Sequence, residues 1–250
     1  MKQVSPYSWD MHSHALPGLD DGAEDWEESL EMARVAVACG TTRMVLTPHY
    51  LAGVYEPEAA TIRSLTAEFR KRLLAAGVSL VVLEGCEAFL SPEIPELLAA
   101  GRLITLADKG GYVLVELPAG ELPSWAGQVL FHIRVRGVVP ILAHPERNVV
   151  LSARPQLLQA FIQQGVLVQV NGASLTGHHG RAAQKAAEQW LRYGWVHILG
   201  SDAHAPQGWR SPDLRAAIAR LRRLRLDLAP AITVDIVRPQ EVASYRGAIG

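Results

Sequence analysis

The sequence has few cysteines, almost no net charge and no long hydrophobic run, and each shortage narrows what the protein can be. Its 250 residues include only two cysteines, Cys39 and Cys86. A chain of this length needs no disulfide for stability, so we expect two reduced, buried thiols. The formal net charge of −1 provides no overall basic field, which argues against nucleic acid as the main partner. No apolar run approaches the roughly 20 residues that span a bilayer, so membrane insertion is not expected.

Sequence motifs of several other enzyme classes are missing as well. Cysteine-based tyrosine phosphatases bind phosphate in a loop between a cysteine and an arginine, and neither cysteine here begins such a loop. The sequence contains neither a P-loop nor the G-x-G-x-x-G motif of dinucleotide-binding proteins. The segment Met1–Tyr7 has no apolar stretch typical of a secretory signal, so we expect a cytoplasmic location.

What the sequence does contain is a regular alternation of short apolar runs with longer segments of helical periodicity. Apolar residues make up 49% of the chain, and near-continuous apolar runs are typical of parallel strands that are covered on both faces. The runs predict strands at Trp9–His12, Arg43–Pro48, Leu80–Glu84, Tyr112–Leu117, Val138–Ala143, Leu167–Asn171 and Val196–Gly200. Helices are expected at Glu27–Cys39, Pro57–Ala76, Ile94–Ala99, Pro123–Arg136, Pro155–Gln164, Arg181–Tyr193 and near Pro212–Leu224.

A glycine stands between a predicted helix and the next strand at several places. Glycine readily adopts the left-handed conformation that ends many helices, so this position supports a series of right-handed βαβ units. Seven strands of this kind favour a closed α/β barrel, and a doubly wound open sheet is the structural alternative. We expect one domain over residues 1–250. The glycines are Gly40, Gly77, Gly137, Gly165 and Gly194.

Residues that can bind metals gather where the predicted strands end. The C-terminal ends of barrel strands open onto one face, which carries the active site. Most of the strands deliver a histidine, aspartate or glutamate there, and such residues are costly to bury unless they are paired or bind a metal. The strand-end segments are Asp10–His14, Thr47–His49, Glu84–Glu87, Glu116–Pro118, Ala143–Arg147, Asn171–Gly172 and Ser201–His204.

Two of these segments carry pairs of metal-binding residues two positions apart. His12 and His14 lie on an extended segment, where residues i and i+2 point to the same side, so both imidazoles can reach one ion. Asp202 and His204 are expected to repeat this geometry on the last strand, which neighbours the first once the barrel closes. Imidazole with carboxylate is a ligand set for zinc, manganese or iron.

On these motifs the chain resembles the PHP family of phosphoesterases, named for polymerase and histidinol phosphatase domains, over roughly residues 9–238. Within that family, the run His12–Gly22, HSHALPGLDDG, is similar to the opening motif of bacterial capsule and exopolysaccharide tyrosine phosphatases of the CpsB/CapC type. The other segments that carry the resemblance are Glu28–Leu30, Thr47–Tyr50, Gly85–Glu87, Glu116, His144–Arg147 and Ser201–His204.

The resemblance implies a distorted (β/α)7, TIM-like barrel and a site for three divalent metal ions, with manganese as the first candidate and iron or zinc as others. It implies that Glu87 bridges two ions and that Arg147 and Arg210 contact the phosphate; Asp202 is placed among the catalytic residues too. The implied ligands are His12, His14, Glu87 and Asp202 for one ion, Glu87, Glu116 and His144 for a second, and Asp21, His49 and His204 for a third.

Several assignments stay open at this stage. Glu84 competes with Glu87 for the bridging role, and Asp20 competes with Asp21. Asp10 is interpreted as a partner that orients a metal-binding histidine. The sequence identifies no general acid for the leaving group, although His178, His179 and Arg210 are candidates by their position on loops.

The expected function is that of a metal-dependent protein-tyrosine phosphatase. The resemblance implies a phosphotyrosine protein as partner, namely the tyrosine-rich tail of a bacterial tyrosine kinase that regulates capsular or exopolysaccharide synthesis. The alternative is a small-molecule phosphatase of the histidinol-phosphatase type. A nuclease and a non-catalytic scaffold fit less well, because the charge is near neutral and the ligand set is full. A homo-oligomer is left open.

Overall fold

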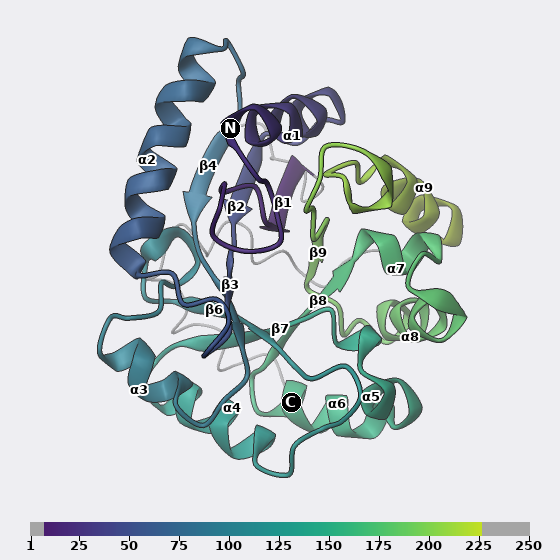
Figure 1. Cartoon of the computed structure of the whole chain (residues 1–250). Helices are drawn as coiled ribbons and strands as arrows, with labels where there is room; N and C mark the ends of the chain where they lie inside the picture. The colour runs from purple at the N-terminus through teal and green to yellow at the C-terminus, as the bar shows by residue number, and fades with distance from the viewer. Residues whose placement is uncertain (1–7, 227–250) are drawn as a thin grey trace, which may run out of the picture.

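Parallel strands form the centre of the molecule and helices form its outer layer (Figure 1). The computed structural model describes residues 8–226. The N-terminal segment Met1–Tyr7 and the C-terminal end of the predicted 1–250 domain lie outside the described residues, as does part of the predicted 9–238 resemblance. None of the helices between residues 8 and 226 combines the length and the apolar character that crossing a bilayer requires.

The strands form two hydrogen-bonded ladders that together encircle the core. One ladder has the order β1-β2-β4 and the other has the order β3-β5-β6-β7-β8-β9, with all pairs parallel. The strands are β1 (Trp9–Ser13), β2 (Arg43–Leu46), β3 (His49–Tyr50), β4 (Val81–Glu84), β5 (Glu87–Phe89), β6 (Tyr112–Glu116), β7 (Val139–Ala143), β8 (Leu167–Asn171) and β9 (Ile198–Gly200).

Two of the expected strands are broken, which is why the ladder is divided. The expected strand Arg43–Pro48 is interrupted at Thr47–Pro48, so that β3 continues β2, because proline has no N–H with which to extend a ladder. The expected strand that ends at Glu84 resumes as β5 after Gly85–Cys86. The strands after the breaks, β3 and β5, pair with each other, and β5 also pairs with β6. This pairing does not support the alternative of an open sheet.

The first and last strands of the described chain meet at a single point. Ser13 and Ala203 form an isolated parallel bridge, the N–H of Asp202 donates to the carbonyl of His12, and the N–H of His14 donates to the carbonyl of Ala203. The hydrogen bonding is therefore not continuous around a closed barrel. The prediction of a distorted α/β barrel is nevertheless confirmed in the arrangement of the seven parallel strand positions.

The outer layer consists of helices that follow the strands in chain order. All five glycines expected to end helices have a positive φ, between 66° at Gly77 and 95° at Gly40, as left-handed caps require. The short helices α5 and α7 were not expected. The helices are α1 (Trp26–Ala38), α2 (Ala59–Ala75), α3 (Ile94–Ala99), α4 (Ala126–Val135), α5 (Val149–Ala153), α6 (Pro155–Gln163), α7 (Gly172–Thr176), α8 (Gly180–Arg192) and α9 (Arg215–Leu224).

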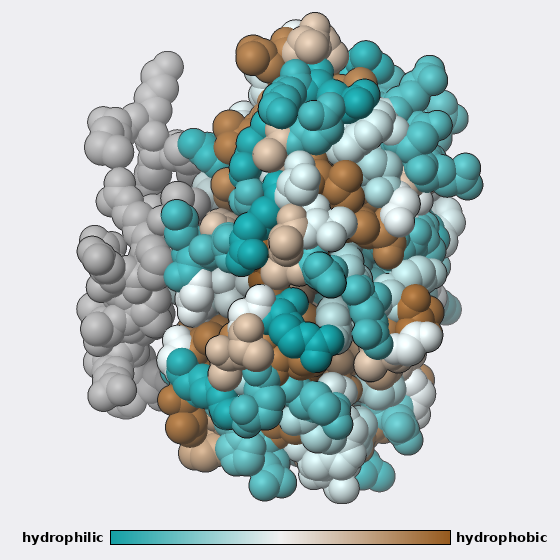
Figure 2. Space-filling view, turned by 60° about the vertical axis from the view of Figure 1, so that its left-hand side comes forward, coloured by the Kyte–Doolittle hydropathy of each residue, from teal (hydrophilic) through white to brown (hydrophobic). Residues whose placement is uncertain are grey.

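The core has two parts, one on each side of the strands. The larger part lies between strands and helices and includes Val113, Val115 and Trp190. The smaller part includes Leu114 and Ile141. Leu114 lies two residues before Glu116, so the two share a strand face, and the smaller core forms a floor beneath the polar strand ends. On the side that Figure 2 brings forward, hydrophilic and hydrophobic residues are interspersed, as expected of amphipathic outer helices.

Candidate metal centre

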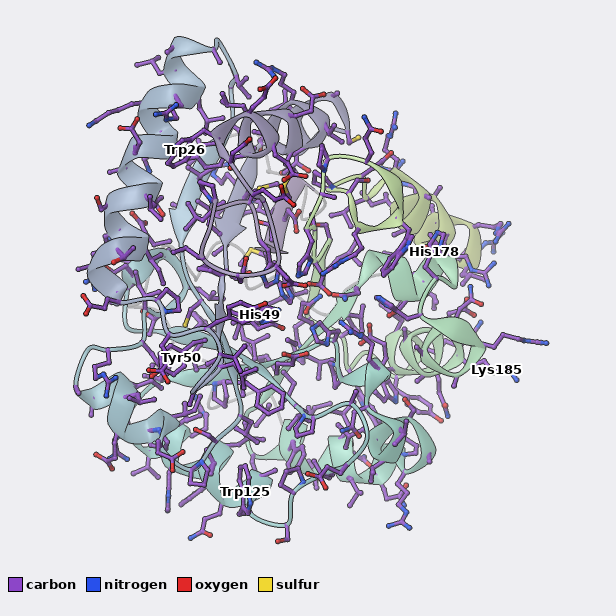
Figure 3. The ribbon with its side chains drawn as sticks, viewed as in Figure 1. Trp26, His49, Tyr50, Trp125, His178 and Lys185 are labelled. Carbon is purple, nitrogen blue, oxygen red and sulfur yellow. The ribbon has the colours of Figure 1, made fainter. Side chains whose placement is uncertain are left out.

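The C-terminal ends of the strands converge on one group of histidines and carboxylates. Figure 3 shows His49 near the middle of the ring of strands, with His178 toward the side of α7 and α9. Within residues 8–226, three sets of side chains bring potential ligand atoms to within 4.8 Å of one another. These sets are His12, Glu87, His144 and Asp202; His49, Glu87 and Glu116; and His14, Asp21, His49 and His204. Together they contain every residue that the sequence predicted as a ligand.

Four atoms define the deepest part of the group. His12 Nε2 lies 3.1 Å from both His14 Nε2 and Glu87 Oε2. Asp202 Oδ1 lies 3.4 Å from His12 Nε2 and 3.3 Å from His14 Nε2. Ligands bound at about 2.0–2.2 Å in a tetrahedral site lie about 3.3–3.6 Å apart. These distances are therefore close to the edges of a coordination shell around one ion.

The hydrogen bonds of the two histidines show that this spot requires a cation. His12 Nδ1 donates to Gln169 Oε1 at 3.2 Å, and His14 Nδ1 donates to Asp20 Oδ2 at 2.7 Å. In the neutral rings, the Nε2 atoms therefore carry lone pairs, and these lone pairs face each other across 3.1 Å. The buried Oε2 atom of Glu87 also has no hydrogen-bond partner. Such an arrangement is repulsive unless a metal ion or a proton lies between the atoms, so the residues fit a metal.

The pKa shifts in the cluster also indicate that its carboxylates stabilise positive charge. Burial opposes protonation of His12, but the negative charges of Glu87 and Asp202 outweigh it and raise its pKa to about 9. His14 is likewise fully buried, yet Asp20 above all raises its pKa well above the usual value. Burial would raise the pKa of Glu87, but His12 holds it well below its usual range. In the absence of metal, protons on histidine neutralise these carboxylates; a bound cation performs that role without them.

Glu87 connects the deep atoms with a second set of ligands. Its Oε1 lies 2.9 Å from His144 Nε2, and its Oε2 lies 3.0 Å from His49 Nδ1. Glu116 is further away, at 3.9 Å from each of the same two histidine nitrogens. Both oxygens of one buried carboxylate thus face different ligand groups, which is the geometry that a bridging ligand needs.

The third set lies nearer to solvent. Asp21 Oδ1 is 3.3 Å from His204 Nε2 and 3.6 Å from His49 Nε2. The rings of His14 and His204 stack with centroids 3.9 Å apart. His49 has one ring nitrogen toward Asp21 and the other toward Glu87, so it lies between the second and third sets rather than in the third set alone.

The geometry separates the residues that competed in the sequence. Glu84 forms a two-pronged ion pair with Arg70 at 2.8 and 2.9 Å and belongs to none of the three sets. Asp20 accepts hydrogen bonds from His14 Nδ1 and from the N–H groups of Gly22 and His49. Its oxygens are therefore used to orient other residues. The arrangement favours Glu87 and Asp21 as the ligands, while the ligand roles themselves stay predictions.

Both arginines that the sequence assigned to phosphate lie at the rim of the cluster. Arg147 Nη1 donates to Asp202 Oδ2 at 3.2 Å, and Arg210 Nη2 donates to Asp21 Oδ2 at 3.1 Å. The side chain of Arg147 is 36% exposed to solvent and that of Arg210 is 39% exposed. They therefore contact opposite parts of the cluster and still have N–H groups available to an anion.

Two expectations about supporting residues were wrong. Asp10 does not orient a histidine ring: its carboxylate accepts from the N–H and Oγ of Ser201 and from the N–H of His12, and so it joins the first and last strands. Asp202 does not repeat the extended geometry of His12, since its φ is +55°. The chain leaves β9 in a left-handed turn, a conformation that costs energy outside glycine and is common at functional sites.

The residue that holds His12 was missed. Gln169 Oε1 accepts from both His12 Nδ1 and the N–H of His144, and Gln169 Nε2 donates to Asn171 Oδ1. Asn171 Nδ2 then donates to Asp202 Oδ2 at 2.7 Å. The signal was available in the sequence, because Gln169 and Asn171 lie two apart in an otherwise apolar strand and so point to the same face as the ligands.

Comparison with families and curated proteins gives a consistent result. The family model described as capsular polysaccharide synthesis, CpsB/CapC, matches residues 8–235. The tyrosine-protein phosphatase YwqE of Bacillus subtilis is 36% identical over 195 residues, which are 78% of this chain and 76% of that protein. The tyrosine-protein phosphatase CpsB of Streptococcus pneumoniae is 26% identical over 200 residues, with coverage of 78% and 82%.

Solved structures agree on the fold. A crystal structure from work on YwqE of Bacillus subtilis and CpsB of Streptococcus pneumoniae, described there as metal-dependent tyrosine phosphatases, superposes with a TM-score of 0.82 at 34% identity and covers 86% of each chain. The histidinol phosphate phosphatase of Lactococcus lactis, solved with zinc, L-histidinol and phosphate, gives a TM-score of 0.54 at 11% identity, covering 86% of this chain and 92% of that one. The second likeness concerns the fold alone.

Proposed function

This chain belongs to the CpsB/CapC family of capsular polysaccharide synthesis, and on that premise we propose that it is a metal-dependent protein-tyrosine phosphatase. The observation that carries the proposal is the deep cluster in which His12, His14 and Glu87 direct unpaired ligand atoms at one point. Two partly exposed arginines at its rim add the means to hold a phosphate.

The proposed ligand set is the nine residues that the structure brings together, and we propose that they hold three divalent ions. Bound metal ions lower the pKa of a coordinated water and stabilise the charge on a transferring phosphoryl group. Manganese, with iron or zinc as alternatives, suits imidazole and carboxylate ligands. Three such ions bring about +6 against the −4 of Asp21, Glu87, Glu116 and Asp202, which leaves a site attractive to a phosphate dianion.

The remaining work belongs to the chain's own groups. Arg147 and Arg210 lie on opposite parts of the cluster, so together they can orient the phosphoryl oxygens and stabilise charge that develops on them. Gln169 and Asp20 hold His12 and His14 in the tautomer whose Nε2 faces the cluster. The phenol of tyrosine has a pKa of about 10, so it leaves more easily than an alkanol would.

The proposal extends to the substrate and its setting. The substrate is a phosphotyrosine protein, and the tyrosine-rich tail of a bacterial tyrosine kinase that regulates polysaccharide export is the candidate. Such a tail is phosphorylated at the expense of ATP, so a cytoplasmic location is part of the proposal. The chain is proposed to act as one domain, because a single main core joins residues from Ala15 to Leu221.

A combined metal and activity measurement tests the proposal. The purified protein is analysed for bound metals and assayed on a phosphotyrosine peptide and on histidinol phosphate, with and without a chelator. We expect two to three ions per chain, with chelator-sensitive turnover of the peptide that Asp202→Ala abolishes. Asp213→Ala is a matched control, since Asp213 is paired with Arg215 away from the cluster. Turnover of histidinol phosphate alone would favour the small-molecule alternative, and full activity in metal-free protein would refute the mechanism.

A further inference from the structure

One aromatic side chain at the rim has no role in the proposed chemistry. Trp209 lies in a 3₁₀ turn, Gly208–Arg210, directly before the arginine that reaches Asp21. Half of its surface, 50%, is exposed to solvent. Large aromatic side chains are usually more deeply covered, and this one is held beside a charged site.

Two consecutive histidines fix the position of the indole. His178 stacks on Trp209 with ring centroids 6.0 Å apart and planes inclined by 15°. His179 meets the indole edge to face, with centroids 5.3 Å apart and an interplanar angle of 90°. These are the arrangements that aromatic pairs prefer. The ring is therefore supported from two directions, although it remains half exposed.

His179 is itself anchored to the buried interior. Its Nδ1 lies 3.0 Å from Ser174 Oγ, and Ser174 Oγ donates to Glu146 Oε1 at 2.6 Å. The N–H of Asn171 also donates to this Glu146 oxygen, so the oxygen is an acceptor. Because the hydroxyl hydrogen of Ser174 points to Glu146, Ser174 Oγ accepts a hydrogen bond from the Nδ1–H of His179. A buried carboxylate thus orients His179 through one hydroxyl group.

This support connects the indole to both phosphate-binding arginines. Glu146 precedes Arg147 in the chain, so the residue that anchors His179 and the arginine at the rim belong to one turn, Pro145–Arg147. Helix α8, which begins directly after His179, packs against this same turn. Trp209 is therefore the sequence neighbour of Arg210 and contacts, through His179, the segment that packs on the turn of Arg147.

We propose that the exposed face of Trp209 contacts the phenyl ring of the phosphotyrosine while Arg147 and Arg210 hold its phosphoryl group. This inference rests on the proposed phosphatase function and adds the residue that distinguishes an aryl ester from an alkyl ester. A phenyl ring is bonded directly to the ester oxygen, so it must lie just outside the phosphate site, and the half-exposed indole directly precedes the arginine at that rim. An alkyl phosphate offers no flat face for the indole to stack on.

The contact has a kinetic signature. The ring is unchanged in size and shape between bound ester and transition state, so Trp209 contributes equally to both. Trp209→Ala is expected to raise KM for phenyl phosphate and for a phosphotyrosine peptide about tenfold, with kcat changed less than about twofold. Trp209→Phe retains a flat aromatic face and is expected to recover most of the loss.

The experiment compares three substrates on four proteins. Wild type, Trp209→Ala, Trp209→Phe and Phe131→Ala are assayed on phenyl phosphate, a phosphotyrosine peptide and glycerol 1-phosphate, and the metal content of each is measured. Phe131 is the matched control, because it is 53% exposed and lies on α4 away from the site. Binding of phenylphosphonate and of methylphosphonate is measured by calorimetry as a readout that requires no turnover.

The outcomes separate this inference from the function on which it rests. The inference stands if Trp209→Ala raises KM for phenyl phosphate and Kd for phenylphosphonate. KM for glycerol 1-phosphate and Kd for methylphosphonate should then stay within about twofold of the wild-type values. It is overturned if KM or Kd rises equally for the alkyl compounds. It is also overturned if KM rises for the peptide alone, since the indole then contacts the flanking peptide and not the phenyl ring. Wild-type protein that hydrolyses no phosphotyrosine would refute the proposed function instead.

Discussion

The deep part of the site and its rim differ in burial and in how their polar atoms are paired. The side chains of His12, His14 and Glu87 have no exposed surface, and their polar atoms are fixed by hydrogen bonds or directed at one another. At the rim, Arg147 and Arg210 each pair with one carboxylate and keep over a third of their surface in water. On the proposed function, metal completes the deep part, whereas the partly exposed arginines at the rim are left for a substrate to bind.

The strongest test of this contrast removes the carboxylate that is proposed to bridge two ions. Glu87→Gln is expected to lower kcat/KM by about a thousandfold or more, because the amide cannot supply the negative charge that four nearby histidine nitrogens face. Bound metal should fall by at least one ion per chain in the same preparation. Steady-state assays and elemental analysis check both effects.

Glu84→Gln provides the matched control three residues earlier. Glu84 pairs with Arg70 outside the cluster, so its amide should keep activity within about twofold, as surface ion pairs contribute little. Loss of activity in this variant, with normal activity in Glu87→Gln, would reverse the assignment of the bridge.

A substitution at the rim should act on substrate and spare the metal. Arg147→Ala is expected to reduce kcat/KM by about a hundredfold, since one charged donor to a phosphoryl oxygen is lost. Metal content should stay at the wild-type value, because the guanidinium touches Asp202 from outside the cluster. Arg63→Ala, which breaks an exposed pair with Asp108, is the control. If Arg147→Ala also lowers the metal content, Arg147 supports the metal ligands and does not act on the substrate alone.

A smaller effect is expected from the residue that orients His12. Gln169→Leu leaves His12 Nδ1 without its acceptor, and loss of such an outer partner typically weakens metal affinity about 10–100-fold. Activity should therefore fall at low metal concentration and return when metal is added in excess. The exposed Gln189, bonded to Tyr193, gives the control Gln189→Leu. Activity that excess metal does not restore would show that Gln169 does more than orient a ligand.

The smallest expected effect on activity lies at the opposite end of strand β9. His197 Nδ1 accepts from the N–H of Val168, and burial lowers its pKa from 6.5 to about 4. The folded protein therefore keeps it neutral where the unfolded chain takes up a proton. Its contribution to stability is complete above pH 6.5 and is lost as pH falls toward 4, by up to about 3 kcal/mol.

His197→Gln keeps an acceptor without a titrating group and isolates this contribution. From pH 7 to pH 5, the wild type should lose about 2 kcal/mol more unfolding free energy than the variant. Urea unfolding at the two pH values measures the difference, and activity at pH 7 should not change. Equal losses in both proteins would show that His197 is protonated in the native state.

Periodic features of the sequence predicted the frame of the fold well. The strand Leu167–Asn171 and the helix Ile94–Ala99 have the expected bounds, and the glycines that end helices have positive φ. These features are local: apolar runs and caps depend on a few adjacent residues. The predicted ligands also converge, because parallel strands of known order bring their C-terminal ends to one face.

What the sequence did not predict depends on contacts between distant segments. The division of two strands, at Thr47–Pro48 and at Gly85–Cys86, depends on how the ladder shifts from one set of neighbours to another. The left-handed turn at Asp202 is held by a hydrogen bond to His12, far away in the chain. The strand pattern of Gln169 and Asn171 indicates the face on which they lie, but not that Gln169 accepts from His12 and His144, which come from other strands.

The bridge between Ser13 and Ala203 sets the order in which the site can be made during synthesis. The first predicted ligands, His12 and His14, leave the ribosome early, but Asp202 and His204 come nearly at the end of the described chain. Until those last residues emerge, the buried carboxylate of Glu87 and the paired imidazoles lack their final partner and the strands that would enclose them. A growing chain that stops before Asp202 therefore has no complete cluster, and we expect full metal binding only after Asp202 and His204 have emerged.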